Sequence, residues 1–196
     1  SMRLNFNRGE SNDRIRYPIF GSQLKKYNGK PLDSFNRLRL HSGGNDSKNT
    51  NFTDGLISAL SAGMNIGTCA YQPVMLFVNA ESWGLYALRE HYTKDYFEKH
   101  FDVQGDNLIL LEFIWGCGNV PNVSEGVEQD RAYYEDYYRF VQKSDFSQDA
   151  VYQRFCDEYV DIESFMDCYI AYVVQLHGLA GQQHQNVAGE NTGGGE

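Results

Sequence analysis

The spacing of apolar residues predicts a chain that mixes strands with helices. Residues 1–34 hold short apolar stretches separated by five turn-forming residues, Gly9, Pro18, Gly21, Gly29 and Pro31. Such frequent breaks favour strands and turns over a long helix. Apolar and polar positions then alternate from Phe35 to Leu40, which predicts a strand, and a polar glycine-containing loop follows at residues 42–47.

A helix and a hairpin are predicted next. Apolar residues recur at helical spacing from Phe52 to Met64, after possible capping residues at 49–51 and with Gly63 as an end signal. Two apolar runs, 71–78 and 83–88, flank the turn residues 79–82. Because both runs are almost uniformly apolar, they predict a buried hairpin.

The second half of the chain is predicted to be mainly helical. A short helix is expected at 93–100 and a strand at 107–113, and helical spacing resumes near Val127 with a stripe of tyrosines. The last helix begins at Asp161, a good N-cap, and carries an apolar stripe that requires a core to pack on. Residues 178–196 are rich in Gly, Gln and Asn and are expected to be a disordered tail. The predicted fold class is α+β, with one folded domain at 1–177.

Charge and composition narrow the range of partners. The 26 acidic residues outnumber the 17 basic ones, which gives a formal net charge of -9 and disfavours binding to nucleic acid or to an anionic membrane. No apolar run approaches the roughly 20 residues that a membrane span needs. The 4 cysteines lack CxxC spacing and predict buried free thiols, while two disulfides in a secreted protein remain an open alternative.

Common catalytic motifs are missing from the sequence. It contains no dinucleotide or P-loop glycine signature, no zinc-protease motif and no nucleophile elbow, and its 5 histidines are too scattered to favour a zinc site. Three local clusters carry more information. They are LHSGGND at 40–46 with FTD at 52–54, YQPV at 71–74 with NAESWGLYALRE at 79–90, and VDIESFMD at 160–167.

In this order and at these separations, the clusters resemble the CotH family, the spore-coat-associated kinases and their relatives. That family carries an LRNxGND loop, an FRD helix start, a YxPV strand, an NGxYWGxY hairpin that closes on RE, and a later DxxxFxD helix. The resemblance runs from about Arg3 to Leu176, and the hairpin is its most specific part. It implies an atypical protein-kinase-like fold, with an N-lobe antiparallel sheet and hinge followed by the first helices of the C-lobe.

The resemblance also implies transfer of the γ-phosphate of ATP to a serine or related hydroxyl of a protein, with Mg²⁺ or Mn²⁺ as the metal. It places Leu88, Arg89 and Glu90 at the hinge, and it adds Asp46 and Asp54 to the nucleotide-binding residues. It assigns no catalytic residue and no metal ligand within this chain. Each acid also has a structural explanation: Asp46 as acceptor of backbone N–H groups in a loop, Asp54 as a first-turn acid of a helix, and Glu90 as an ion-pair partner.

Departures from the family pattern predict a copy that does not transfer phosphate by itself. His41 stands where the family has Arg, and Thr53 replaces the Arg before Asp54. The family's phosphate-binding Lys is expected just upstream of Ser1. Its catalytic Asp is expected after the last helix, where no acid precedes Glu190.

Two functions are therefore expected. The first is a fragment or divergent copy of a CotH-like protein kinase domain, with a protein substrate in the intact parent. The second is a non-catalytic binding module or adhesin on a cell surface or spore coat. The resemblance suggests that the protein is located at the cell surface, in the spore coat or outside the cell as a secreted protein. A truncation or frameshift would explain the tail. Without most of a C-lobe, the fragment would expose the apolar face that the last helix should cover, and self-association is expected.

Overall fold

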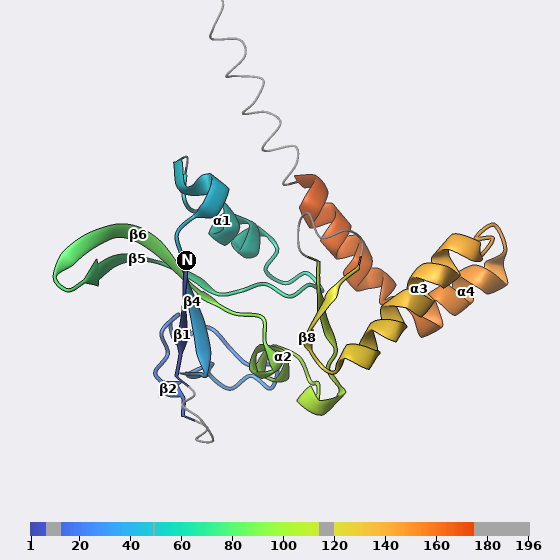
Figure 1. The fold of residues 1–196 in the computed structure, drawn as a ribbon, viewed down its shortest axis with the longest axis horizontal. Coiled ribbons are helices and arrows are strands. Elements are labelled where there is room, and N and C mark those ends of the chain that lie inside the picture. The colour runs from blue at the N-terminus through green and yellow to red at the C-terminus, as the bar shows by residue number, and fades with distance from the viewer. Residues whose placement is uncertain (7–12, 49, 114–119, 175–196) are drawn as a thin grey trace, which may run out of the picture.

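The computed structural model describes residues 1–6, 13–48, 50–113 and 120–174, and it has the predicted α+β class (Figure 1). Its main sheet is antiparallel with the strand order β1-β4-β6-β5, as expected for a kinase-like N-lobe. Those strands are β1 (Met2–Asn5), β4 (Arg37–His41), β5 (Tyr71–Val78) and β6 (Glu81–Glu90). Two smaller pairs join β2 (Ile15–Arg16) to β3 (Ser34–Phe35), and β7 (Leu110–Glu112) to β8 (Asn122–Glu125).

The helices follow the predicted order with one addition. They are α1 (Thr53–Leu60), α2 (Lys94–His100), α3 (Arg131–Lys143), α4 (Asp149–Glu158) and a last helix at 162–174, with short 3₁₀ turns at Gly44–Lys48, Gly105–Asn107 and Glu128–Asp130. The predicted cap at Asp161 is confirmed, because its carboxylate accepts a hydrogen bond from the Ser164 N–H at 3.0 Å. The sequence pattern did not separate α4 from its neighbours. No helix within the described residues has the length and apolar character needed to cross a membrane.

A small core lies under one face of the main sheet. Its most buried side chains are Leu32, Phe35 and Leu38. Seven partly buried residues pack around them: Leu4, Phe6, Ile15, Ile19, Phe20, Leu24 and Leu88. Successive side chains of a strand point to opposite faces, so burying Leu38 and Leu40 turns Arg37 and Arg39 of the same strand to the other face.

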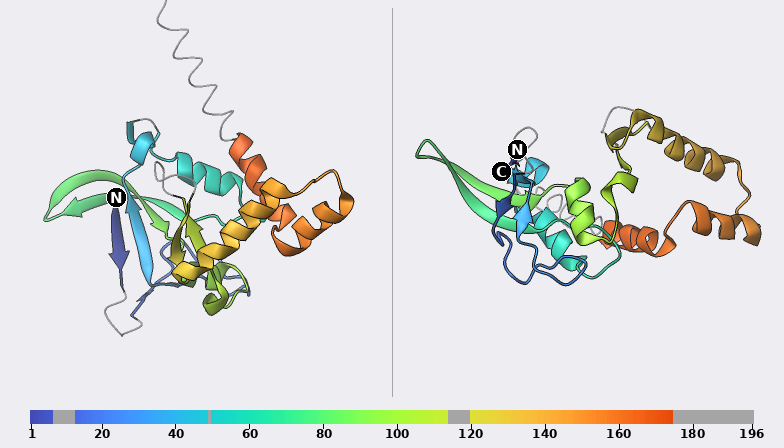
Figure 2. Two further views of the ribbon diagram at one scale, coloured as in Figure 1. Left: turned by 45° about the vertical axis from the view of Figure 1, so that its right-hand side comes forward. Right: turned by 90° about the horizontal axis from the view of Figure 1, so that it is seen from below.

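The β5–β6 hairpin forms where the sequence predicts it but is not buried. Its turn residues Asn79 and Ala80 both have positive φ, 50° and 66°, which is typical of the type I′ turn that suits the twist of two paired strands. The hairpin projects away from the rest of the chain, at the end opposite to α3 and α4 (Figures 1 and 2). Four large side chains, Met75, Phe77, Trp83 and Leu85, are between 46% and 61% exposed. The prediction of a buried hairpin is wrong.

The tyrosine stripe of α3 serves as an interface between helices. Tyr137 stacks on Phe155 of α4, and Phe140 stacks on Tyr159 with ring centroids 4.7 Å apart. The two helices lie next to each other in both views of Figure 2. This aromatic contact fixes α3 against α4, as the sequence pattern predicted for a core or interface stripe.

The last helix meets the rest of the chain through polar groups. Asp161 and Asp167 accept hydrogen bonds from the side chain and the backbone N–H of Asn65, at 3.1 and 2.6 Å. Six apolar or aromatic residues of the helix are at least half exposed: Phe165, Met166, Tyr169, Ile170, Tyr172 and Val174. The prediction that this stripe packs on a core is wrong for the described residues.

The cysteines are free thiols where the structure describes them. Cys69 is buried, as predicted, and burial raises the pKa of its thiol to about 11. Cys156 is half-buried and Cys168 is exposed, which differs from the predicted burial. Cys117 and the predicted tail at 178–196 lie outside the described residues.

Candidate functional site

Three arginines stand side by side on the open face of the main sheet. Arg39 of β4 lies directly opposite Arg3 of β1 and directly opposite Arg89 of β6. Residues opposite each other in antiparallel strands share a face, so the three guanidinium groups form one row, called here the arginine row. Like charges in such positions repel one another. The row is therefore suited to hold anions.

One end of the arginine row is neutralised by α1. The Asp54 carboxylate accepts from Arg89 Nη1 at 2.5 Å, and it lies 3.9 Å from His41 Nδ1. The helix can approach this closely because Gly55 lies against the ring of Tyr71, where an added Cβ would be only 2.6 Å from that ring. Arg3 and Arg39 form no ion pair or side-chain hydrogen bond with any residue that the structure describes.

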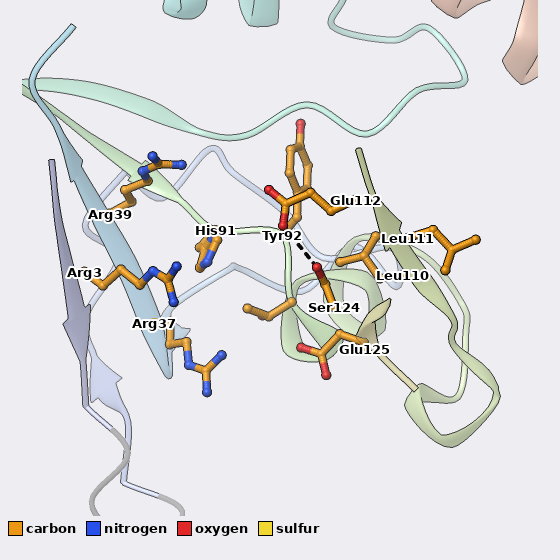
Figure 3. Close-up of a pocket in the computed structure, with 11 residues that line it drawn as sticks. Arg3, Arg37, Arg39, His91, Tyr92, Leu110, Leu111, Glu112, Ser124 and Glu125 are labelled. Carbon is orange, nitrogen blue, oxygen red and sulfur yellow. Dashed lines mark hydrogen bonds between the residues drawn. The ribbon is translucent and has the colours of Figure 1, made fainter. Parts of the chain in front are cut away.

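The two unpaired arginines open into a cavity of about 420 Å³ between the sheet and the β7–β8 hairpin (Figure 3). The cavity is lined by Arg3, Arg37, Arg39, His91, Tyr92, Thr93, Leu110, Leu111, Glu112, Ser124 and Glu125. Its volume lies within the range of small-molecule binding sites. One wall is formed by arginines, and the facing wall carries the carboxylates of Glu112 and Glu125 (Figure 3).

His91 lies between these walls, and the pKa of its imidazole depends on the charges of the arginines. Burial lowers the pKa of its imidazole, and the positive charges of Arg3, Arg39 and Arg37 lower it further. An anion bound among the arginines would oppose that effect. The imidazole is therefore a natural reporter of anion binding in the cavity.

A model of the family described as CotH kinase protein matches residues 1–175. The chain belongs to the CotH kinase family. No curated protein and no solved structure matches it. In the CotH chain the cavity adjoins the segment 91–93, which follows directly on the residues 88–90 that the sequence resemblance places at the hinge.

The three predicted hinge residues do not face the same way. Arg89 is in the arginine row, whereas Leu88 packs on the core and Glu90 is 6% exposed. The Glu90 carboxylate accepts from the Ala70 N–H at 3.0 Å and lies 2.9 Å from His100 Nε2. It thus joins β6 to the preceding loop and to α2, and its role in nucleotide binding stays a prediction.

Asp46 holds the start of α1. Its carboxylate accepts hydrogen bonds from the N–H groups of Thr53 and Thr50, at 3.0 and 3.2 Å. Partial burial raises the pKa of Asp46, but these hydrogen bonds and those of the two hydroxyls outweigh it, so the pKa lies below its usual value. Phe52, the residue before α1, makes no side-chain capping bond, so Asp46 supplies the acceptor that the sequence analysis assigned to residues 49–51.

Two residues that the sequence predicts for the site, Arg89 and Asp54, form an ion pair in the structure, whereas the residues that line the large cavity were not predicted as site residues. Arg37 and Arg39 have a signal in the alternating sequence RLRLH, which places both arginines on the face opposite the buried leucines. Glu112 and Glu125 have no comparable signal. They reach the cavity because β7 pairs with β8 and because this hairpin faces the sheet across the cavity.

The cavity offers few side chains that could hold the metal implied by the family resemblance. Within the described residues, no three His, Cys, Asp or Glu side chains are grouped so that they could hold a metal ion. Mg²⁺ is commonly held by one or two carboxylates together with phosphate oxygens, so Glu112 and Glu125 of the cavity are compatible with a metal bound together with phosphate groups.

A second, smaller cavity of about 200 Å³ lies next to the Arg89–Asp54 pair. Its lining includes Ile57 of α1 and Ala171 of the last helix. The last helix therefore contributes to the surroundings of the ion pair, although its large apolar side chains point away from the packed part of the chain.

Proposed function

We propose that this chain is the nucleotide-binding part of a CotH-like protein kinase domain and that it holds the phosphates of ATP on the arginine row. The observation that carries the proposal is the row itself, in which Arg3 and Arg39 line a cavity of about 420 Å³ and form no ion pair with the described residues. Phosphoryl transfer depends mainly on positioning and on neutralising charge, and guanidinium groups bind phosphate oxygens in bidentate fashion.

The Arg89–Asp54 ion pair supports the same proposal. Protein kinases need an ion pair between a cation on an N-lobe strand and an acid on the following helix, because that pair positions the cation at the phosphates. Here a strand cation and a helix acid also meet, at 2.5 Å, with the acid in the first turn of α1, although in this chain the helix precedes the strand that carries Arg89. We assign to this pair the corresponding role of fixing α1 beside the arginine row.

For the intact domain, the proposed reaction is ATP-dependent and metal-dependent phosphorylation of a serine or threonine of a protein. This chain would bind nucleotide without transferring phosphate, since no acid follows Asp167 before Glu190, where the family resemblance places a catalytic Asp. The metal would supply charge neutralisation at the phosphates. The arginines would orient the phosphate chain.

A thermal-shift titration with ATP and Mg²⁺ or Mn²⁺ tests the proposal. A ligand that binds only the folded state raises the melting temperature by linkage. We expect a saturable rise for the wild type, and an ATP affinity about 10-fold or more lower for Arg39→Gln, because a charge-assisted hydrogen bond contributes about 1.5–3 kcal/mol. Without ligand, Arg39→Gln should melt no lower than the wild type, because it relieves repulsion within the row.

Arg16→Gln provides a matched control. Arg16 is an exposed arginine of β2 that does not line the cavity. Its substitution removes the same charge and should leave ATP binding unchanged. If the folded wild type shows no shift with ATP and metal, or if both substitutions weaken binding equally, the arginine row is not a nucleotide site.

A protein-binding role is the second candidate function. The exposed face of the β5–β6 hairpin favours it, because Met75, Phe77, Trp83 and Leu85 gather large apolar side chains at a projecting tip. A folded chain that binds no nucleotide but loses binding to its partner after Phe77→Ser and Trp83→Ser would support this function.

A further inference from the structure

The walls of the large cavity carry opposite charges, which restricts the kind of ligand that can fill it. Arg3, Arg37 and Arg39 belong to β1 and β4, whereas Glu112 and Glu125 belong to β7 and β8 (Figure 3). The facing charges form no ion pair among the residues that the structure describes. The cavity is thus built for a ligand with an anionic end and a hydrogen-bond-donating end.

Both carboxylates are fixed by a protein donor that leaves one oxygen free. The Ser124 hydroxyl donates to Glu112 Oε2 at 3.1 Å, and the Lys94 backbone N–H donates to Glu125 Oε1 at 3.3 Å. No donor within the described residues occupies Glu112 Oε1 or Glu125 Oε2. An ionised carboxylate only accepts hydrogen bonds, so the free oxygens require donors from the ligand.

These charges also fix the orientation of a nucleotide. Phosphates are repelled by Glu112 and Glu125 and attracted by the arginines, so the triphosphate lies toward the sheet and the nucleoside toward the β7–β8 hairpin. The groups of a nucleoside that donate to carboxylates include the 2′- and 3′-hydroxyls of ribose. A 2′-deoxyribose lacks one of these donors.

We infer that Glu112 and Glu125 accept hydrogen bonds from the ribose hydroxyls and that the β7–β8 hairpin selects ribonucleotides over 2′-deoxyribonucleotides. This inference rests on the proposed function, because it requires the triphosphate to lie on the arginine row. The two glutamates are specificity-determining residues in this scheme. Ser124 is a positioning residue, since it acts through Glu112.

The test compares the binding of ATP, 2′-deoxy-ATP and tripolyphosphate to the full chain by isothermal titration calorimetry, in the presence of Mg²⁺. We expect the wild type to bind ATP about 10-fold or more tightly than 2′-deoxy-ATP, because a hydrogen bond to a charged acceptor is lost. In the double variant Glu112→Gln/Glu125→Gln this ratio should fall to about 2-fold or less. Glu81→Gln, at the exposed hairpin tip, is the matched control and should keep the wild-type ratio.

The ratio of the two nucleotides separates recognition of the sugar from bulk electrostatics. Removing two negative charges near the phosphates should strengthen the binding of ATP, 2′-deoxy-ATP and tripolyphosphate alike, and this common effect cancels in the ratio. If the wild type binds both nucleotides equally, the inference is overturned and the proposed function stands. If neither ATP nor tripolyphosphate binds the folded wild type, the proposed function is overturned, and the inference with it.

Discussion

The strongest predicted effect on stability concerns a buried cluster of charges between α2 and the N-terminal segment. Asp95 is 8% exposed and accepts hydrogen bonds from Arg14 and from Lys99 Nζ, the latter at 2.7 Å. Lys99 also donates to the carbonyl oxygen of Ser34 at 2.5 Å. Burial lowers the pKa of Lys99, and Asp95 opposes that effect. Asp95 is thus the charge that allows Lys99 to be buried as a cation.

Asp95→Asn keeps the size of the side chain and removes its charge. It leaves Lys99, whose side chain is 12% exposed, without a counter-charge, and Arg14, at 24% exposed, without its partner. Breaking a buried pair from one side costs about 3–5 kcal/mol. Because Arg14 retains access to water, we expect the lower end, about 3 kcal/mol, or about 6–12 °C in melting temperature for a chain of this size.

Denaturant unfolding at pH 7 and at pH 10 measures this effect. In the variant the folded-state pKa of Lys99 should fall further below its unfolded value, so the unfolded chain binds more protons and stability rises with pH in that window. The deficit relative to the wild type should therefore shrink toward pH 10. This pH signature distinguishes an unpaired Lys99 from a simple packing defect.

Asp106→Asn provides the control, because Asp106 pairs with Lys94 of the same helix α2. Asp106 accepts from Lys94 Nζ at 2.5 Å, but its side chain is 94% exposed, so removing its charge should leave stability unchanged within error. If Asp95→Asn is as harmless as Asp106→Asn, burial does not determine the strength of these pairs and the reasoning fails.

Three further predictions concern the cap, the cavity and the hairpin. Asp46→Ala removes the acceptor for the Thr53 N–H and should lower the free energy of unfolding by about 1 kcal/mol, measured in guanidinium chloride. The pKa of His91 is lowered in the folded chain, so the unfolded chain takes up this proton first as pH falls below about 6.5, and stability should fall with it. His91→Gln should flatten that dependence in melting curves between pH 7.5 and 5.5. Finally, the wild type should self-associate with rising concentration in analytical ultracentrifugation. The double variant Phe77→Ser/Trp83→Ser should self-associate less, since both aromatic side chains are more than half exposed. A wild type that stays monomeric contradicts this last prediction.

Local signals in the sequence were reliable where short-range chemistry decides the structure. The helical spacing after residue 52, the cap at Asp161 and the turn at Asn79 and Ala80 all give the predicted elements. In each case the residues that carry the signal are close in sequence to the backbone that they order. Tertiary context adds to these elements without changing their type.

Burial was harder to predict, because it depends on what lies next to an element. The hairpin is apolar along both strands, yet β4 pairs only with residues 87–90 of β6 through its Leu38–His41 segment. Residues 81–86 extend beyond β4 and have no neighbouring strand on that side. Uniform hydrophobicity therefore does not indicate burial in this hairpin.

The candidate site could be predicted only in part for a related reason. The family pattern selects Leu88, Arg89 and Glu90 as a contiguous group, but strand alternation turns Arg89 to the open face of the sheet, in the arginine row, and its two neighbours to the opposite face. The wall with Glu112 and Glu125 forms only when a distant hairpin faces the sheet across the cavity. No local pattern in the sequence encodes that approach.

The strand β6 runs from the projecting tip, through one bulge at Trp83, to the segment that lines the cavity. Because side chains alternate between the two faces from Leu85 to Arg89, deleting or inserting one residue between them would turn the arginine into the core and bring Leu88 or Glu90 to the open face. Homologous chains can therefore differ freely in the identity of the tip residues, but we expect changes in chain length to gather at the turn and to spare the strand. The alternation of side chains along the strand therefore fixes the number of residues between the hairpin tip and Arg89. A related chain in which this number changes by one should lack the arginine on the open face of the sheet.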